Sequence, residues 1–160
     1  MSHAIYGARK YERTQSRNKM NTKLGRSDAC GAPQARARLT HAGKFLEVAE
    51  LVAGEAELGT EPASASVSAA LAVLAGIAAS DAACCIALGK RSRGDDHLQA
   101  KTFLESIDGG NKPAAALSDL ITLKDSAHYG LINISLPQLK IALRRAHTLV
   151  EFARSLLDAD

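Results

Sequence analysis

A long segment without a charged side chain, residues 62–80, constrains the fold of this chain more than any other feature. It is rich in alanine and serine, and Asp81 follows it directly. A membrane span of this length is expected to be more apolar and not to end in a carboxylate. We therefore expect a helix over roughly residues 63–91, apolar nearly all round and buried at the centre of a bundle. Its small residues recur every four positions and predict a narrow ridge for close helix packing, formed by Ala72, Gly76, Ser80 and Cys84.

Hydrophobic periodicity predicts further helices on both sides of this segment. They are expected at residues 34–53, at 95–107, from 111 or 112 up to the interruption "YGLINI", and at 136–157. Ser135 and Gln138 form a capping box in front of the last helix. Because the connections are short and no strand pattern is present, we expect one all-α, up-and-down bundle of about five helices.

The N-terminal residues 1–33 are expected to form a disordered basic tail in front of the bundle domain at 34–160. Residues 1–30 hold seven Lys or Arg and two acidic residues, whereas the net charge of the whole chain is only +3. Isolated apolar residues in the tail follow no period, so they bury too little surface to offset the entropy of ordering. Met20 offers a second start of translation besides Met1. The tail is expected to add phosphate affinity that weakens with salt.

The chain has three cysteines, and two of them, Cys84 and Cys85, are neighbours in the central helix. Adjacent helical cysteines point in different directions and bridge only with strain. Because the count is odd and no CxxC pattern is present, we expect no disulfide framework and a cytoplasmic, reducing location. The N-terminus lacks the apolar stretch of a secretory signal, and we expect no association with a membrane.

The sequence lacks the familiar motifs of cofactor and metal sites. It has no glycine-rich phosphate loop, no HExxH, no cysteine pairs at zinc spacing and no GxSxG. Its five histidines are dispersed along the chain. We therefore expect no cofactor and no metal, which leaves two clusters that combine basic residues with a histidine.

The first cluster is "KRSRGDDHL" at residues 90–98. Basic residues at the end of one helix and acidic residues at the start of the next suit the two helix dipoles, so capping alone explains these charges. The functional alternative is a compact polar corner that holds a phosphate through Arg91, Arg93 and His97.

The second cluster is "LKDSAHYG" at residues 123–130. If the fourth helix extends through it, Lys124 and His128 lie on one helical face. A cation that stabilises a phosphorane and an imidazole that moves a proton would suffice to cleave RNA through its own 2′-hydroxyl. The alternative is that both residues end a helix while Tyr129 packs against the bundle.

These features follow one another in a recognisable order: the long small-residue-rich helix, "RGDDH", "LKDSAHYG" and the amphipathic last stretch "ALRRAHTLVEFAR". Together they resemble the HEPN superfamily, and within it the short stand-alone proteins of its actinobacterial branch. The resemblance covers residues 36–157. It implies a helical bundle that forms a homodimer through its long helices. It also implies a role in a toxin–antitoxin or stress-response system, as a ribonuclease toxin or beside a nucleotidyltransferase-type antitoxin.

Active members of this family carry an arginine, usually a polar residue next to it, and a histidine after four to six intervening positions, just before the final helix. The matching residues here are Lys124, Asp125 and His128, with lysine in place of arginine and three residues in between. Lysine cannot grip a phosphate with a bidentate fork. Arg91 and His97 have five residues between them, but they precede the third expected helix and not the last.

The preferred hypothesis is a non-enzymatic or weakly active HEPN-like protein that binds RNA or another nucleic acid, a nucleotide or a partner protein. The second and fourth helices of an up-and-down bundle end on the same side, which makes one site from both clusters geometrically possible. That site combines Lys124, His128 and Tyr129 with Arg91, Arg93 and His97. The alternative is a metal-independent endoribonuclease in which His128 moves the proton, Lys124 stabilises the charge and Asp125 orients.

Overall fold

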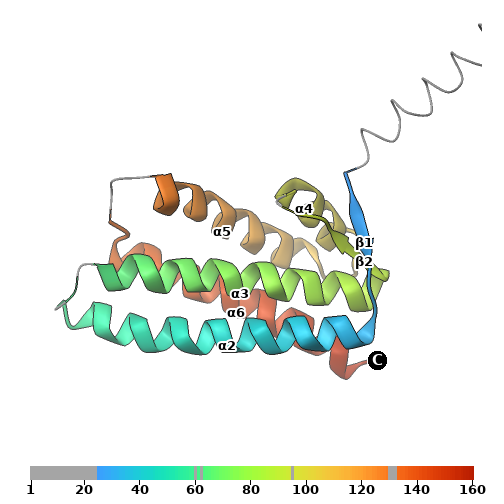
Figure 1. Ribbon diagram of the computed structural model, residues 1–160, viewed down its shortest axis with the longest axis horizontal. Helices are drawn as coiled ribbons and strands as arrows, with labels where there is room; N and C mark the ends of the chain where they lie inside the picture. The colour runs from blue at the N-terminus through green and yellow to red at the C-terminus, as the bar shows by residue number, and fades with distance from the viewer. Residues whose placement is uncertain (1–24, 60, 62, 95, 130–132) are drawn as a thin grey trace, which may run out of the picture.

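The uncharged segment forms helix α3 (Ala63–Leu88), which runs through the centre of a bundle of helices (Figure 1). The structure is a computed structural model that describes residues 25–59, 61, 63–94, 96–129 and 133–160, with the backbone alone for 126–129. Most side chains of α3 are buried. α3 is long and apolar enough to cross a membrane, but 67% of its most apolar window is buried inside the protein. This burial fits the central core helix expected from the sequence.

Within the described part of the chain, four further helices surround α3, and the predicted all-α bundle is confirmed. They are α2 (Ala32–Glu57), α4 (His97–Glu105), α5 (Asn111–Tyr129) and α6 (Leu136–Asp158). The expected capping box is present in front of α6, since Gln138 N donates to Ser135 Oγ at 3.3 Å and Ser135 N donates to Gln138 Oε1 at 2.9 Å. The expected ridge of small residues on α3 is buried as well. At Gly76 an added Cβ would lie 2.4 Å from Leu120 Cδ1, because α5 packs so closely there.

The direction of α5 differs from the expected one. α4 has 9 residues and is about 14 Å long, whereas α3 with 26 residues is about 39 Å long. The short helix therefore does not cross the bundle, and α5 starts near the end of α3 and runs antiparallel to it (Figure 1). Near the other end of α5, Leu123 packs against a cluster that contains Ala53 of α2 and Ala65 of α3. The prediction that the second and fourth helices end on the same side is wrong.

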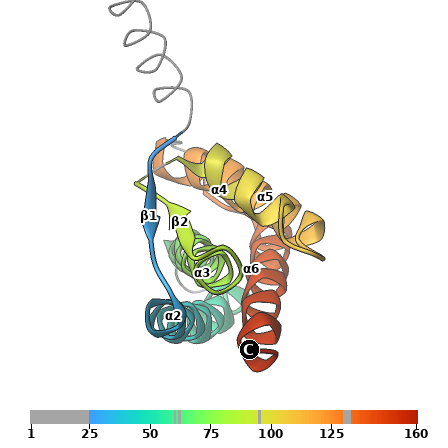
Figure 2. The ribbon, with the colours of Figure 1, turned by 90° about the vertical axis from the view of Figure 1, so that its right-hand side faces the viewer.

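The N-terminal segment is ordered earlier than expected. β1 (Ser27–Ala29) pairs antiparallel with β2 (Lys90–Ser92), and α2 begins three residues after β1. Figure 2 shows the two strands side by side at the end of α3. The boundary expected at residue 33 is therefore wrong, because pairing with a distant strand orders residues 25–33. The earlier part of the expected tail, including Met20, lies outside the described residues.

A disulfide joins Cys30 to Cys85, at a Cα–Cα distance of 5.2 Å and a sequence separation of 55. The expectation of no disulfide is wrong. As anticipated for neighbours in a helix, the two cysteines diverge: Cys85 meets Cys30 and Cys84 stays free and buried. Because two of the three cysteines are paired, the cysteines no longer favour a reducing compartment, and cytoplasmic location stays a prediction.

Candidate functional site

A buried carboxylate on the central helix gathers two arginines from other elements. Asp81 Oδ2 accepts hydrogen bonds from Arg38 Nη2 at 2.7 Å, Arg38 Nε at 3.0 Å and Arg91 Nη1 at 3.0 Å. The Asp81 side chain is 12% exposed, whereas Arg38 and Arg91 are 31% and 37% exposed. Because the Asp81 carboxylate is mostly shielded from water, its negative charge needs such partners. One negative charge fixes two positive ones and leaves their outer edges toward solvent.

A second carboxylate, Asp28 of β1, lies near one of these arginines, Arg91, and near a third one, Arg93. In the strand register Asp28 lies opposite Arg91. Its Oδ2 is 3.7 Å from Arg91 Nη2, and its Oδ1 is 3.7 Å from Arg93 Nε. These distances suit ion pairs and are too long for hydrogen bonds. Arg93 is 60% exposed. We refer to Arg38, Arg91 and Arg93 as the arginine cluster.

His97 lies beside this cluster, at the first position of α4. It lines a cavity of about 20 Å³ together with Ser80, Asp81, Ser92 and Gly94. This volume has room for one water molecule. The Ser80 hydroxyl is buried at this cavity. Arg91 and Arg93 both lie near Asp28, and His97 shares this cavity with Asp81, the partner of Arg91. Phosphate binding by Arg91, Arg93 and His97 stays a prediction.

Among the described residues of this motif, Asp96 fits the capping explanation. Asp96 caps α4, because its Oδ1 accepts a hydrogen bond from Gln99 N at 3.0 Å. The basic residues do not cap α3, which ends at Leu88, before Gly89 with a φ of 66°. Lys90 and Arg91 belong to strand β2, and Lys90 Nζ lies 4.9 Å from the centre of the Phe103 ring.

Cys84, the free cysteine near the arginine cluster, is unreactive. Burial above all, and then the negative charge of Asp81, raise the pKa of the Cys84 thiol to about 12. The thiolate is the nucleophile in disulfide exchange, so a thiol with this pKa stays protonated and inert at neutral pH. Cys84 therefore does not attack the neighbouring disulfide between Cys30 and Cys85.

The second motif lies at the opposite end of the bundle. Its residues continue α5 up to Tyr129, so Lys124 and His128 are separated by one helical turn on one face. Lys124 is half-buried and Asp125 is exposed. The side chains of His128 and Tyr129 lie outside the described residues. Because α5 ends beside the α2–α3 turn, most of the length of α3 separates this motif from the arginine cluster, and the expected joint site does not form.

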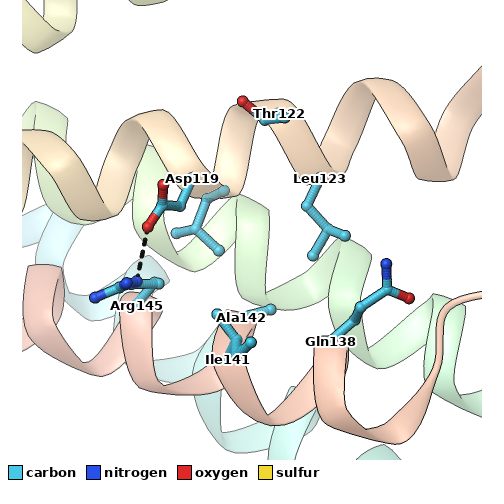
Figure 3. Close-up of a pocket in the computed structure, with 8 residues that line it drawn as sticks. Asp119, Thr122, Leu123, Gln138, Ile141, Ala142 and Arg145 are labelled. Atoms are coloured by element: carbon cyan, nitrogen blue, oxygen red, sulfur yellow. Dashed lines mark ion pairs between the residues drawn. The ribbon is translucent and has the colours of Figure 1, made fainter.

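A groove between α5 and α6 lies next to the second motif and was not predicted. It has a volume of about 210 Å³ and mostly apolar walls, with Leu123, Gln138 and Ile141 among the lining residues (Figure 3). Asp119 and Arg145 face each other in it, with Asp119 Oδ2 2.9 Å from Arg145 Nε (Figure 3). That contact has the distance of an ion pair but does not meet the geometry of a hydrogen bond. Sequence could not have shown the groove, because its residues come from two helices whose pairing depends on the direction of α5.

Comparison with known proteins adds no relative: no protein-family model matches the chain, and no curated protein matches it either. The HEPN resemblance therefore stays a prediction. Within the described part of the chain, no three His, Cys, Asp or Glu side chains are grouped so that they could hold a metal ion.

Proposed function

We propose that this protein binds the phosphates of RNA or a nucleotide at the arginine cluster. The supporting observation is the pair of guanidiniums held on the single buried carboxylate of Asp81. Each guanidinium carries five N–H donors, far more than one carboxylate oxygen accepts. Their planar forks suit phosphate oxygens. Arg93 adds a third, more exposed cation at the same corner.

Two further features favour RNA or another nucleic acid over a mononucleotide. Residues 1–24 hold six Lys or Arg and one acidic residue. They join the described chain at Gly25, whose carbonyl accepts a hydrogen bond from Gln99 Nε2 at 2.6 Å, beside the arginine cluster. A basic arm attached at this point would add phosphate contacts that do not depend on base sequence. The HEPN resemblance points to RNA as well.

Arg93→Ala is expected to weaken binding of a fluorescently labelled single-stranded RNA about tenfold, because a charge-assisted contact is lost. The slope of log affinity against log salt should also fall by about one. Fluorescence anisotropy over a salt series measures both. Arg144→Ala, an exposed arginine in the middle of α6, is the matched control and should leave the affinity unchanged. Equal losses in both variants would show that binding is only general attraction to basic surface.

The alternative function is a metal-independent endoribonuclease that uses Lys124, Asp125 and His128. The observation that favours it is the continuous helical backbone from Lys124 to His128, which keeps the two residues one turn apart. The same labelled RNA, incubated with the protein and EDTA, is expected to stay intact. Cleavage that His128→Ala abolishes and His97→Ala leaves in place would establish the enzyme instead.

We further propose that the protein forms a homodimer through α2 and α3. Large apolar side chains are exposed along these two helices, including Leu51, Val67 and Leu74. A second copy would cover them, and Leu74→Glu is expected to give a monomer in light scattering after size exclusion. Leu98→Glu, at an exposed leucine of α4, is the control and should leave the mass unchanged. The nucleotidyltransferase-type antitoxin is proposed as a protein partner from the HEPN resemblance alone.

A further inference from the structure

We propose that β1 is a disulfide-held clasp over the arginine cluster, and that reducing the Cys30–Cys85 bond increases the affinity of the cluster for phosphate. This inference rests on the proposed function, because it describes the regulation of the same site. It needs three things of the structure: a carboxylate that competes with phosphate, a covalent hold on the strand that carries it, and access of a reductant to that bond.

The competing carboxylate is Asp28. It lies within ion-pair distance of two members of the cluster, at 3.7 Å from both Arg91 Nη2 and Arg93 Nε. A phosphate that approaches these guanidiniums from solvent must displace or share their contacts with Asp28. Asp81 differs from Asp28, because it is buried on α3 and holds Arg38 and Arg91 from below. Asp81 positions Arg38 and Arg91, whereas Asp28 offsets the charge of Arg91 and Arg93 on the exposed side.

The disulfide is the strongest hold on β1. The strand has three residues and pairs only with the equally short β2. A two-stranded ribbon of this kind is marginally stable in water without further support. Hydrogen bonds assist at both ends, from Cys30 N to Gly89 O at 3.0 Å and from Arg93 N to Arg26 O at 2.9 Å. Without the covalent bond these contacts open and close locally, and Asp28 leaves the arginines for part of the time.

Cys30 is the more exposed end of the disulfide, and we expect a reductant to approach the bond from that side. Cys30 is half-buried, whereas Cys85 is almost completely buried. A thiolate of a dithiol reductant attacks Cys30 Sγ, forms a mixed disulfide and expels Cys85 as a thiolate, which takes up a proton. The second thiol of the reductant then attacks its own sulfur in the mixed disulfide and expels Cys30. Two electrons and two protons pass to the protein, the reductant leaves as a disulfide, and Cys84 takes no part.

The test measures RNA affinity of the full chain by anisotropy, with and without dithiothreitol. Reduction is expected to tighten binding about three- to tenfold, since two surface ion pairs stop competing. Oxidised Asp28→Asn should bind RNA as tightly as the reduced wild type does. Reducing this variant should then change its affinity little. Asp108→Asn, which removes an exposed carboxylate from the turn between α4 and α5, is the matched control and should respond to reduction as the wild type does.

The outcomes separate the clasp from the proposed function. If Arg93→Ala weakens binding while reduction and Asp28→Asn change nothing, the cluster binds phosphate but the clasp is wrong. Weaker binding after reduction also overturns the clasp. If no state binds RNA, the proposed function fails, and amide hydrogen exchange then decides on the clasp alone. Faster exchange at Cys30 and Arg93 after reduction supports a released β1, and unchanged protection there overturns it.

Discussion

Replacing Cys30 by serine lowers the free energy of unfolding by about 3 to 4 kcal/mol, the largest effect that we expect of a single substitution. The disulfide closes a loop with a sequence separation of 55, and it restricts the unfolded chain accordingly. The midpoint of thermal unfolding should fall by about 10 °C, because a domain of this size loses a few degrees per kcal/mol. The variant should stay folded, since the buried bundle core does not depend on β1.

Urea unfolding of the wild type and of Cys30→Ser, each with and without dithiothreitol, measures this effect. The reduced wild type is expected to match the variant, and the variant itself should not respond to the reductant. Equal stability of the oxidised and reduced wild type would contradict the prediction. It would mean that the bond adds no net stability, because strain in the folded protein cancels its effect on the unfolded chain.

Replacing Asp81 by asparagine is expected to lower the free energy of unfolding by about 2 to 4 kcal/mol. The substitution keeps the volume of the side chain but leaves Arg38 and Arg91 without the carboxylate on which both converge. Breaking a buried ion pair costs more than the pair contributes, because the remaining charges stay partly desolvated. Both guanidiniums are about one-third exposed, which places the effect below that of a fully buried pair.

Asp119→Asn is the matched control for this prediction. It removes the carboxylate from the ion pair with Arg145, where both side chains are well exposed, and should cost at most about 1 kcal/mol. Chemical unfolding followed by far-ultraviolet circular dichroism compares the two variants directly. A similar small loss in both would show that burial does not set the strength of the Asp81 network.

Most of the helices could be predicted because their signals are local. The expected 136–157 became Leu136–Asp158 and the start at 111 became Asn111, since a capping box, a "DGGNKP" break and a 3.6-residue apolar period lie within the segments themselves. The third helix was expected from residue 95, whereas Asp96 caps it and α4 begins at His97. Each of these features depends on residues a few positions apart.

Only part of the candidate site could be predicted from the sequence. Arg91, Arg93 and His97 could be singled out because they are close in the chain, and their joint role stays a prediction. Arg38 was missed, because nothing near it in the chain signals that it reaches Asp81, which is 43 residues away. The expected joint site failed for a geometric reason: counting alternate helices assumes that each one crosses the bundle, and α4 is too short to do so.

The helical segments and the burial of α3 could be predicted without the structure, because periodicity and the lack of charge over residues 62–80 are properties of each segment alone. Tertiary structure alone decided the partner of Cys85, the pairing of β1 with β2 and the direction of α5. A three-residue strand carries no period, and one cysteine does not identify another that is 55 residues away. Such contacts form because the packed helices bring the ends of β1, α3 and α4 together.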